Sequence, residues 1–589
     1  MASSGGDTCI AGPSSRKRRF SSSSSSSDDG DSDTDVYIVS GSEDDSDDVV
    51  LSSSSDEEDD CSEANYASAR QWMKIDVTNI PTRPPRFPFL AVPGKTFTIS
   101  SPGDLLEYIQ RFLDDELISM VVEETNRNAA EKVKGCGPCE HSRVKKWVPV
   151  TEEEMWVFLG LLLLQGIVQK PRQDWYWSRN KLLFTPIFGE VMSGNRFQLL
   201  MRMLHFVDNS SISDLSSHPQ PKLHKIWPFL VRLLKNYRSA YVPERDISID
   251  ESLMLYKGRL GWVQYIPLKR ARFGLKFFML CEASSGYVWD VIIYTGKGTN
   301  LGTPANVDPT SPMGTKVVMK LLEPLLGKGY CLTVDNFYTS PELVDLLLLN
   351  RTDVYGTVRA NRKDMPPEFR TQKLKKGEIQ AYQRGKCVAL QWRDKKVVTV
   401  LSTVHSANME TFKDSKGRDV TKPSIVRDYN HTMGGVDKSD QMLANYPVPR
   451  KRQKIYYKKI FRHLLDELTF NSFVLYQKEG GKMNHLDFRL ALIEAIFNRY
   501  LDPARKIKRG RPSGVLDPIR LQERHFPAYI PPTENKATPT RKCFICCKKQ
   551  GDKGRKIRKE TRFWCKSCNK PLCVIPCFEI YHTVPMLPR

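Results

Sequence analysis

The spacing of apolar residues divides the chain into segments of different character. Between residues 105 and 121, apolar side chains recur at intervals of three and four, which predicts an amphipathic helical stretch. Thr151, followed by three glutamates, is a capping-box pattern, and the apolar run 155–164 behind it predicts a buried helix. Helical patterns continue to about residue 241, so the first folded part is expected to be mostly α-helical.

The pattern changes at residue 245, where β-branched and alternating apolar positions begin. Elements are expected in this order: strands at 246–256, 277–281 and 287–294, a helix at 317–326, a strand at 330–334 and a helix at 341–349. Because strands are followed by alternating helix and strand, this part predicts an α/β layer.

Short strands separated by charged turns are expected within residues 356–423, at 378–382, 388–392 and 397–404. Helical patterns return after Gly434, at 454–477 and 485–500. The pattern as a whole therefore predicts a multidomain α+β protein.

Composition separates the two ends of the chain from its middle. Residues 1–70 contain 17 acidic and five basic residues, a net charge of −12. Because the whole chain carries a net charge of +21, residues 71–589 carry +33. A body this basic favours a nucleic-acid partner. The acidic, Ser-rich start predicts disorder, and Arg16–Arg19 is typical of a nuclear import signal. The chain opens without an apolar leader, and its longest apolar run is too short for a bilayer, so a nuclear protein without a membrane partner is expected.

Four aspartates stand where metal-dependent phosphodiester chemistry needs carboxylates. Asp250 and Asp335 each end a strand-like run, and Asp437 and Asp440 share one face if their segment is helical. Hard oxygen ligands of this kind hold pairs of Mg²⁺ ions. Each aspartate taken alone is as readily a cap or turn residue.

The residues around these aspartates resemble the piggyBac transposase family. The matching phrases are Asp250-Glu-Ser-Leu-Met-Leu-Tyr-Lys-Gly-Arg, Val334-Asp-Asn-Phe-Tyr-Thr-Ser, Gly356-Thr-Val-Arg-Ala-Asn and Gly434-Gly-Val-Asp with Asp440-Gln. They occur in order at fitting separations. The resemblance runs from about residue 101 to the C-terminus.

The resemblance implies an RNase H-like core interrupted by a β-rich insertion, with flanking helices that dimerise and bind DNA. The implied divisions follow the chain. They are a tail and Pro-rich lead-in at 1–100, helices at 101–245, core at 246–355, insertion at 356–423, core at 424–446, helices at 447–504, a basic linker at 505–540 and a Cys-rich domain at 541–589.

The resemblance also implies the chemistry. The family's catalytic acids fall on Asp250, Asp335 and Asp437, with a fourth at Asp440, and these residues hold two Mg²⁺ ions. Asp250 and Asp437 are expected to flank both ions and Asp335 to bind one. The implied reaction is nicking, hairpin formation and strand transfer of double-stranded DNA into TTAA sites by a homodimer or larger assembly.

Several basic segments are candidates for DNA contacts. Arg359 and Arg362 fall on DNA-contacting positions of the family, and Lys454 precedes Tyr456, which can stack on a base although the family usually has tryptophan there. Arg509 and Arg511 lie in an AT-hook-like sequence, which is equally typical of an import signal or a solvated linker.

The cysteines near the C-terminus have zinc-ligand spacing. The candidate ligands are Cys543, Cys546, Cys565, Cys568, Cys573, Cys577 and His582. Seven ligands, or eight with Cys547, fit two structural zinc sites. The resemblance implies that this module recognises transposon ends. A structural zinc clip or a RING-like ubiquitin-ligase module are the alternatives, and 13 basic against three acidic residues at 541–589 favour DNA.

Two interpretations of the whole chain remain. The first is an active DNA transposase, which the four retained aspartates favour. The second is a domesticated, catalytically silent DNA-binding protein. The Cys136-Gly-Pro-Cys139 sequence resembles a redox motif, but it stands in a charged stretch between helices and is interpreted as a loop.

Overall fold

The computed structural model divides the chain into two compact units, before and after residue 502, and each unit is described by itself. The structure describes residues 71–100, 103–135, 143–210, 214–267, 269, 271–302, 307–413, 416–450, 453–502, 524–534, 536–548 and 557–584.

Five strands form the centre of the first unit. They are β4 (Asp246–Leu255), β6 (Phe273–Glu282), β7 (Val288–Ile293), β8 (Cys331–Val334) and β9 (Asp353–Thr357). The antiparallel neighbours are β4 with β6 and β6 with β7, whereas β8 runs parallel to β4 and β9 parallel to β8. The order is therefore β7-β6-β4-β8-β9, and the expected α/β layer is present.

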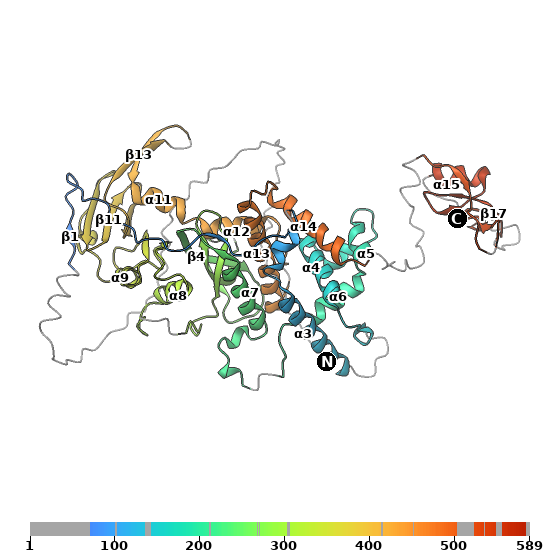
Figure 1. Ribbon diagram of the computed structural model, residues 1–589, viewed down its shortest axis with the longest axis horizontal. Coiled ribbons are helices and arrows are strands. Elements are labelled where there is room, and N and C mark those ends of the chain that lie inside the picture. Colours follow the sequence, from blue (N-terminus) through green and yellow to red (C-terminus); the bar gives the residue numbers. More distant parts are fainter. Residues whose placement is uncertain are drawn as a thin grey trace, which may run out of the picture. The chain divides into compact units, whose positions relative to one another are not determined.

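The strands expected within 356–423 continue this sheet. β12 (Val397–Ser402) pairs with β9, and β11 (Cys387–Arg393), β10 (Ile379–Arg384) and β1 (Met73–Lys74) follow outward in antiparallel order. β13 (Met409–Lys413) and β14 (Asp419–Pro423) form a separate hairpin. In Figure 1, β11 and β13 lie to the left of β4, and helices lie to its right.

Helices α2 (Leu105–Gln110) and α3 (Asp115–Lys134) replace the single helical stretch expected from residue 105. The first helix ends at Gln110, and Asp114 caps the second, its side chain accepting a hydrogen bond from the Leu117 amide at 2.9 Å. Thr151 caps α4 (Glu152–Ile167) as predicted, through a 3.2 Å bond from the Glu154 amide. Both helices belong to the helical end of the unit.

Two late helices complete that end. α13 (Tyr456–Lys478) is buried along most of its length, and α14 (His485–Tyr500) packs on α4 and α2. The chain therefore returns after the sheet to the helices that preceded it. The other helices of this unit are α5 (Pro186–Val191), α6 (Gly194–Met203), α7 (Trp227–Ala240), α8 (Met313–Leu322), α9 (Pro341–Leu349), α10 (Glu368–Thr371), α11 (Ser424–Thr432) and α12 (Gly435–Asn445).

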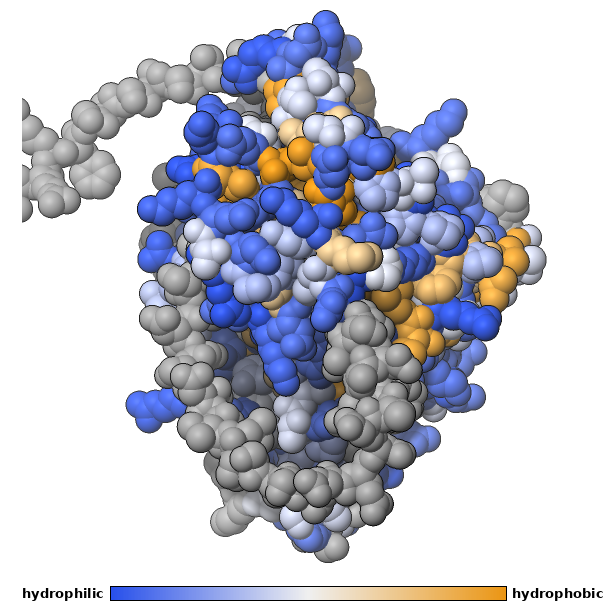
Figure 2. All heavy atoms as spheres, turned by 90° about the vertical axis from the view of Figure 1, so that its left-hand side faces the viewer, coloured by the Kyte–Doolittle hydropathy of each residue, from blue (hydrophilic) through white to orange (hydrophobic). Residues whose placement is uncertain are grey.

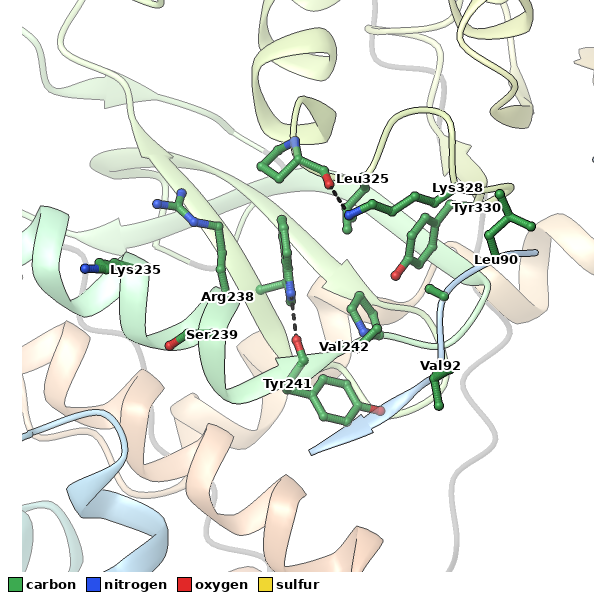
Figure 3. A pocket seen from close by; sticks show the side chains of 14 residues that line it. Leu90, Val92, Lys235, Arg238, Ser239, Tyr241, Val242, Leu325, Lys328 and Tyr330 are labelled. Atoms are coloured by element: carbon green, nitrogen blue, oxygen red, sulfur yellow. Dashed lines mark hydrogen bonds between the residues drawn. The ribbon is translucent and has the colours of Figure 1, made fainter. Parts of the chain in front are cut away.

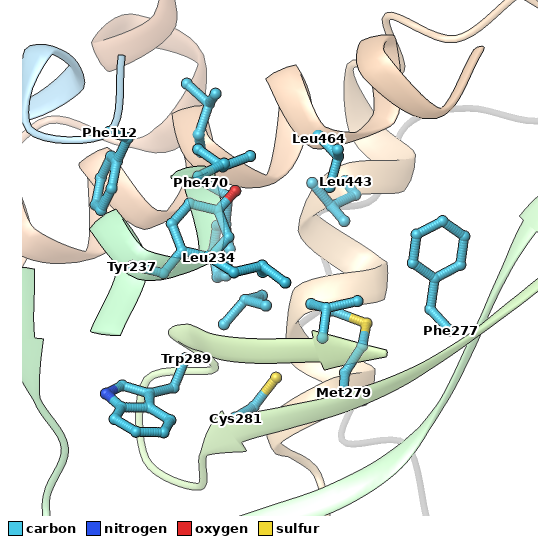
Figure 4. Packing of buried hydrophobic residues seen from close by; sticks show 14 of the residues in the cluster. Phe112, Leu234, Tyr237, Phe277, Met279, Cys281, Trp289, Leu443, Leu464 and Phe470 are labelled. Atoms are coloured by element: carbon cyan, nitrogen blue, oxygen red, sulfur yellow. The ribbon is translucent and has the colours of Figure 1, made fainter. Parts of the chain in front are cut away.

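One large apolar core joins the sheet to the helices. Phe277 and Met279 point from β6 toward the helices that carry Leu443 and Leu464 (Figure 4). A smaller core, which includes Tyr355 and other residues, lies among the outer strands. Because α13 contributes nine of its 18 buried residues to the large apolar core, it ties the helical end to the sheet.

The surface on the β-rich side is mainly hydrophilic, with apolar side chains in smaller groups (Figure 2). None of the helices within the described ranges combines the length and apolar character that a membrane span requires.

The second unit is small. Strand β15 (Pro527–Tyr529) pairs with β18 (Phe563–Cys565), which pairs with β19 (Lys570–Pro571), and α15 (Glu579–Thr583) ends the described part. A further short pair here is β16 (Arg541–Lys542) with β17 (Glu560–Thr561). In the first unit, β2 (Gly94–Lys95) pairs with β3 (Tyr241–Val242), and β5 (Gln264–Tyr265) pairs with the edge of β6.

Candidate functional site

Asp250 and Asp335 lie side by side because of strand register. The parallel pairing of β4 and β8 ends with Ile249 opposite Val334, and the two aspartates are the next residues of the two strands. Gly356 on β9 allows this arrangement, since a Cβ there would lie 2.0 Å from the Val334 carbonyl oxygen. The predicted pairing of these two carboxylates is therefore present in the structure.

Glu251 joins them, a residue that the sequence interpretation did not single out. One carboxylate oxygen each from Asp250, Glu251 and Asp335 lies within 4.8 Å of the others. Lys276 on β6 pairs with Glu251 at 3.0 Å. The signal in the sequence was the adjacent acidic pair at positions 250 and 251, although alternation along a strand argues against a shared site.

Asp437 and Asp440 reach the same region from α12. The segment is helical, as their spacing required, and Ser252 on β4 donates a 2.5 Å hydrogen bond to Asp440. Gly435 permits this close approach, because a Cβ there would lie 2.4 Å from the Ser248 hydroxyl oxygen. Asp437 and Asp440 are not part of the three-carboxylate group.

Lys269 stands between the two sets of acids. Its ammonium donates to the Glu251 carbonyl oxygen at 2.8 Å and lies 4.0 Å from an Asp437 oxygen. Burial favours the neutral amine, but the charges of Asp250, Asp440 and Asp437 outweigh it and raise the pKa of Lys269. A single ammonium thus faces several carboxylates.

Three acids of the site, Asp250, Asp335 and Asp440, resist ionisation. Burial, with the neighbouring Glu251 charge, raises the pKa of Asp335 to about 6, and burial raises the pKa of Asp440 to about 6 despite Ser252 and Lys269. The pKa of Asp250 is also raised by burial. Burial opposes the charge of Glu251 as well, but Lys276 lowers its pKa. A divalent cation such as Mg²⁺ would stabilise the ionised form of these clustered carboxylates, whose hard oxygens are the ligands that it prefers.

The two arginines expected to contact DNA border this site. Arg359 is exposed after β9. Arg362 is mostly buried, and its guanidinium donates to the carbonyl oxygens of Asn336 at 3.2 Å and Phe337 at 2.6 Å. Arg362 therefore holds the loop that directly follows Asp335.

Lys454 and Tyr456 lie where α13 begins. Lys454 is exposed, and its carbonyl oxygen accepts a 2.5 Å bond from the Tyr256 hydroxyl. The Tyr456 ring meets the Trp262 ring edge-on, with centroids 5.9 Å apart. The other candidates, Arg509, Arg511, Cys136, Cys139 and the basic run at 16–19, lie outside the described residues.

The second unit gathers the predicted zinc ligands into two groups. One contains Cys543, Cys546, Cys573 and Cys577, and the other contains His525, Cys565, Cys568 and His582. In each group the sulfur or nitrogen atoms lie within 4.8 Å of one another. The groups interleave along the chain, and four soft ligands each is the donor set of a tetrahedral zinc site.

His525 supplies the eighth ligand, which the sequence interpretation had sought at Cys547. Cys547 belongs to neither group, because its sulfur turns to the Lys559 carbonyl oxygen at 3.8 Å. His525 and β15 fall within the segment that composition had assigned to a linker. An odd count of seven ligands was the signal that one more lay outside the Cys-rich stretch.

A cavity of about 730 Å³ lies away from the carboxylates (Figure 3). Leu90 and Val92 of the lead-in segment face Leu325 and Tyr241 across it. Its lining contains no acidic residue, so it offers no ligand for a divalent cation.

Comparison with known proteins identifies the class. A family model described as Transposase IS4 matches residues 105–473, and a model of a DDE_Tnp_1-like zinc finger matches residues 524–583. The first match covers most of the larger unit and includes every carboxylate described above. The chain is thus a transposase-family protein with a C-terminal zinc finger.

Relatives narrow this class. The human PiggyBac transposable element-derived protein 3 is 27% identical over 530 residues, covering 87% of this chain and 81% of that protein. The human PiggyBac transposable element-derived protein 2 is 25% identical over 391 residues, 64% of this chain and 62% of that protein. The chain belongs to the piggyBac transposase family.

A solved structure supports the fold. A piggyBac transposase in a synaptic complex with hairpin DNA, determined by cryo-electron microscopy, matches with a TM-score of 0.60 and 23% identity. The match covers 82% of this chain and 98% of the other.

Proposed function

We propose that this protein is a cut-and-paste DNA transposase of the piggyBac type, which nicks, forms hairpins and transfers strands into TTAA sites. The observation that carries the proposal is the convergence of Asp250, Glu251 and Asp335, with Asp437 and Asp440 facing them across Lys269. Strand register and the close approach of α12 at Gly435 hold these acids near one another.

The five central strands form an RNase H-like core in this proposal. Their order, with three antiparallel strands followed by two parallel ones, supports it, as does the position of Asp250 on the middle strand. The insertion expected at 356–423 then follows β9, which ends at Thr357, and it extends the core sheet.

Asp250, Asp335 and Asp437 are proposed to hold two Mg²⁺ ions, and Glu251 and Asp440 border them. The bound ions supply Lewis acidity at the phosphodiester and favour an ionised attacking oxygen. The carboxylates orient the ions, while Lys276 and Ser252 orient Glu251 and Asp440. In each step one P–O bond forms and one breaks, and the displaced strand oxygen leaves. Water attacks in the nicking step, and the freed 3′-hydroxyl then attacks the opposite strand to form the hairpin. Water opens the hairpin and regenerates the 3′-hydroxyl, which attacks the target strand at TTAA.

DNA, zinc and the nucleus belong to the same proposal. Double-stranded DNA is the proposed partner, bound by a homodimer or larger assembly, with Arg359 and the start of α13 near the backbone. Each of the two ligand groups of the second unit is proposed to hold one structural zinc. The basic run at 16–19 supports nuclear import.

The descriptions of the relatives suggest an alternative function. Both human relatives are described as derived from a transposable element. A protein of this kind that binds DNA without cutting it is the alternative, and the test below separates the two.

An excision assay in cells tests the proposal. A reporter flanked by TTAA and the terminal repeats nearest this gene is combined with the wild type, Asp335→Asn, or the surface control Asp308→Asn. Excision by the wild type and the control, but not by Asp335→Asn, is expected. If all three proteins bind the repeats in the nucleus and none excises the reporter, the result favours a silent DNA-binding protein.

A further inference from the structure

Four basic side chains from three helices and a turn converge on the helical end of the first unit. They are Lys132 on α3, Arg202 at the end of α6, Lys225 just before α7 and Lys458 in the first turn of α13. The Lys458 ammonium donates to the carbonyl oxygens of Met201 and Arg202, both at 2.8 Å. This bond pair holds the start of α13 against the end of α6.

An aromatic ring links two of these cations. The ammonium groups of Lys225 and Lys458 lie 5.9 and 5.8 Å from the centroid of the Tyr457 ring. The Tyr457 hydroxyl in turn lies 3.4 Å from Nδ1 of His205. A polar hollow of about 540 Å³ opens beside them, and Lys132 and Arg202 form part of its lining.

Among the residues that the structure describes, acidic side chains form no ion pair with these four cations. Glu124 and Asp208, the acids nearby, are both engaged by Arg127, at 2.7 and 3.3 Å. Glu131 lies on the rim of the hollow. Within the part of the chain that the structure describes, no carboxylate oxygen lies within 4.0 Å of the side-chain nitrogens of these four residues.

The cations consequently repel one another. Burial, together with the charges of Lys132 and Arg202, lowers the pKa of Lys458 to about 7. Burial and the charges of Arg202 and Lys225 also lower the pKa of Lys132, against the opposite influence of Glu131. A folded protein gains nothing in stability from such an arrangement, whereas a bound polyanion relieves the repulsion.

We propose that Lys132, Arg202 and Lys225, positioned by Lys458, form a binding site for consecutive backbone phosphates of double-stranded DNA. The site deepens the proposed function and rests on it, because it assigns one part of the DNA path to the helical end, apart from the carboxylates. Exposed Lys132 and Arg202 and half-buried Lys225 supply the contacts, and the buried ammonium of Lys458 keeps α6 and α13 in register. Such contacts position the duplex without reading its sequence.

Salt dependence of binding tests this site. Full-length wild type, Lys132→Gln/Lys225→Gln and the matched surface control Lys376→Gln/Lys482→Gln are titrated with a terminal-repeat duplex at several salt concentrations. Loss of two phosphate contacts makes the slope of log K against log salt shallower by about 1.8, because each contact contributes about 0.9. The control keeps the wild-type slope, and Lys132→Arg/Lys225→Arg restores most of it.

The outcomes are distinguishable. If the wild type binds the duplex and the Lys132→Gln/Lys225→Gln variant has the same slope of log K against log salt, the proposed site is wrong and the proposed function still stands. A wild type that binds no DNA overturns both. Acetylation footprinting of the wild type adds a measurement that needs no variant, since bound duplex should protect Lys132 and Lys225, and full reactivity of both in the complex contradicts the site.

Discussion

At the scale of single residues, Glu467 is an acid that the proposed chemistry does not use. It is fully buried on α13, and Nε2 of His463 lies 3.3 Å from its carboxylate. Burial, with the charges of Asp440 and Asp466, raises the pKa of Glu467 to about 8, and burial lowers the pKa of His463 to about 4. Both side chains are therefore neutral at neutral pH, and this pair adds no charge to the core.

This environment predicts a pH-dependent stability. The pKa of Glu467 is raised in the folded state, so its contribution is complete below about pH 4.5 and is lost as pH rises through about 8. Glu467→Gln should reduce the loss of unfolding free energy between pH 5 and 8.5 by about 2–4 kcal/mol. Chemical unfolding across this range measures it. Glu494→Gln, at an exposed position on α14, should show the same pH dependence of unfolding free energy as the wild type. Parallel plots of unfolding free energy against pH for all three proteins would refute the interpretation.

Zinc ligation gives a second prediction at this scale. His525→Ala should lower the zinc content from about two to about one per chain, because it removes a ligand from only one group. Cys547→Ala should leave about two, since its sulfur faces a carbonyl oxygen. Elemental analysis of the purified full chain measures both. Loss of zinc from Cys547→Ala, with none from His525→Ala, would return the eighth ligand to the position first expected.

At the scale of elements, α12 depends on the absence of side chains at its start. A Cβ at Gly435 would lie 2.4 Å from the Ser248 hydroxyl oxygen and 3.0 Å from the Glu282 carbonyl oxygen, whereas Gly434 has no atom within 4 Å of such a Cβ. The helix therefore reaches β4 only with glycine at position 435. Asp437 and Asp440 owe their distance from β4 to this contact.

Two adjacent glycines provide a matched test of that contact. Gly435→Ala should destabilise the protein by about 1–3 kcal/mol through overpacking and should reduce DNA cleavage by displacing Asp437 and Asp440. Gly434→Ala should change both by much less. Thermal unfolding and a cleavage assay measure the pair. Equal behaviour of the two variants would show that α12 does not need the close approach.

At the scale of the whole molecule, the two units carry different parts of the proposed function. The first carries the carboxylates and the basic cluster, and the second carries both zinc-ligand groups. Each unit has its own buried core, which permits each to fold alone.

Removal of the second unit tests this division. A chain that ends at Leu501 should keep its cooperative unfolding and its affinity for arbitrary duplex DNA. Its preference for terminal repeats should fall at least about tenfold if the zinc unit recognises ends. Competition binding with repeat and scrambled duplexes measures the preference. An unchanged preference would give the zinc unit a purely structural role.

The sequence by itself predicted the types of most elements and seven of the eight residues that form the two Cys/His groups, because periodicity, caps and Cys spacing are local features. The four aspartates were predicted from the family resemblance of the residues around them. Only the tertiary structure decided that Glu251 joins Asp250 and Asp335, that His525 completes the second zinc group, and that four cations meet beside α13. Those groupings depend on strand register, on the close approach of α12 and on chain segments far apart in sequence. Such distances are decided by packing, which no local pattern records.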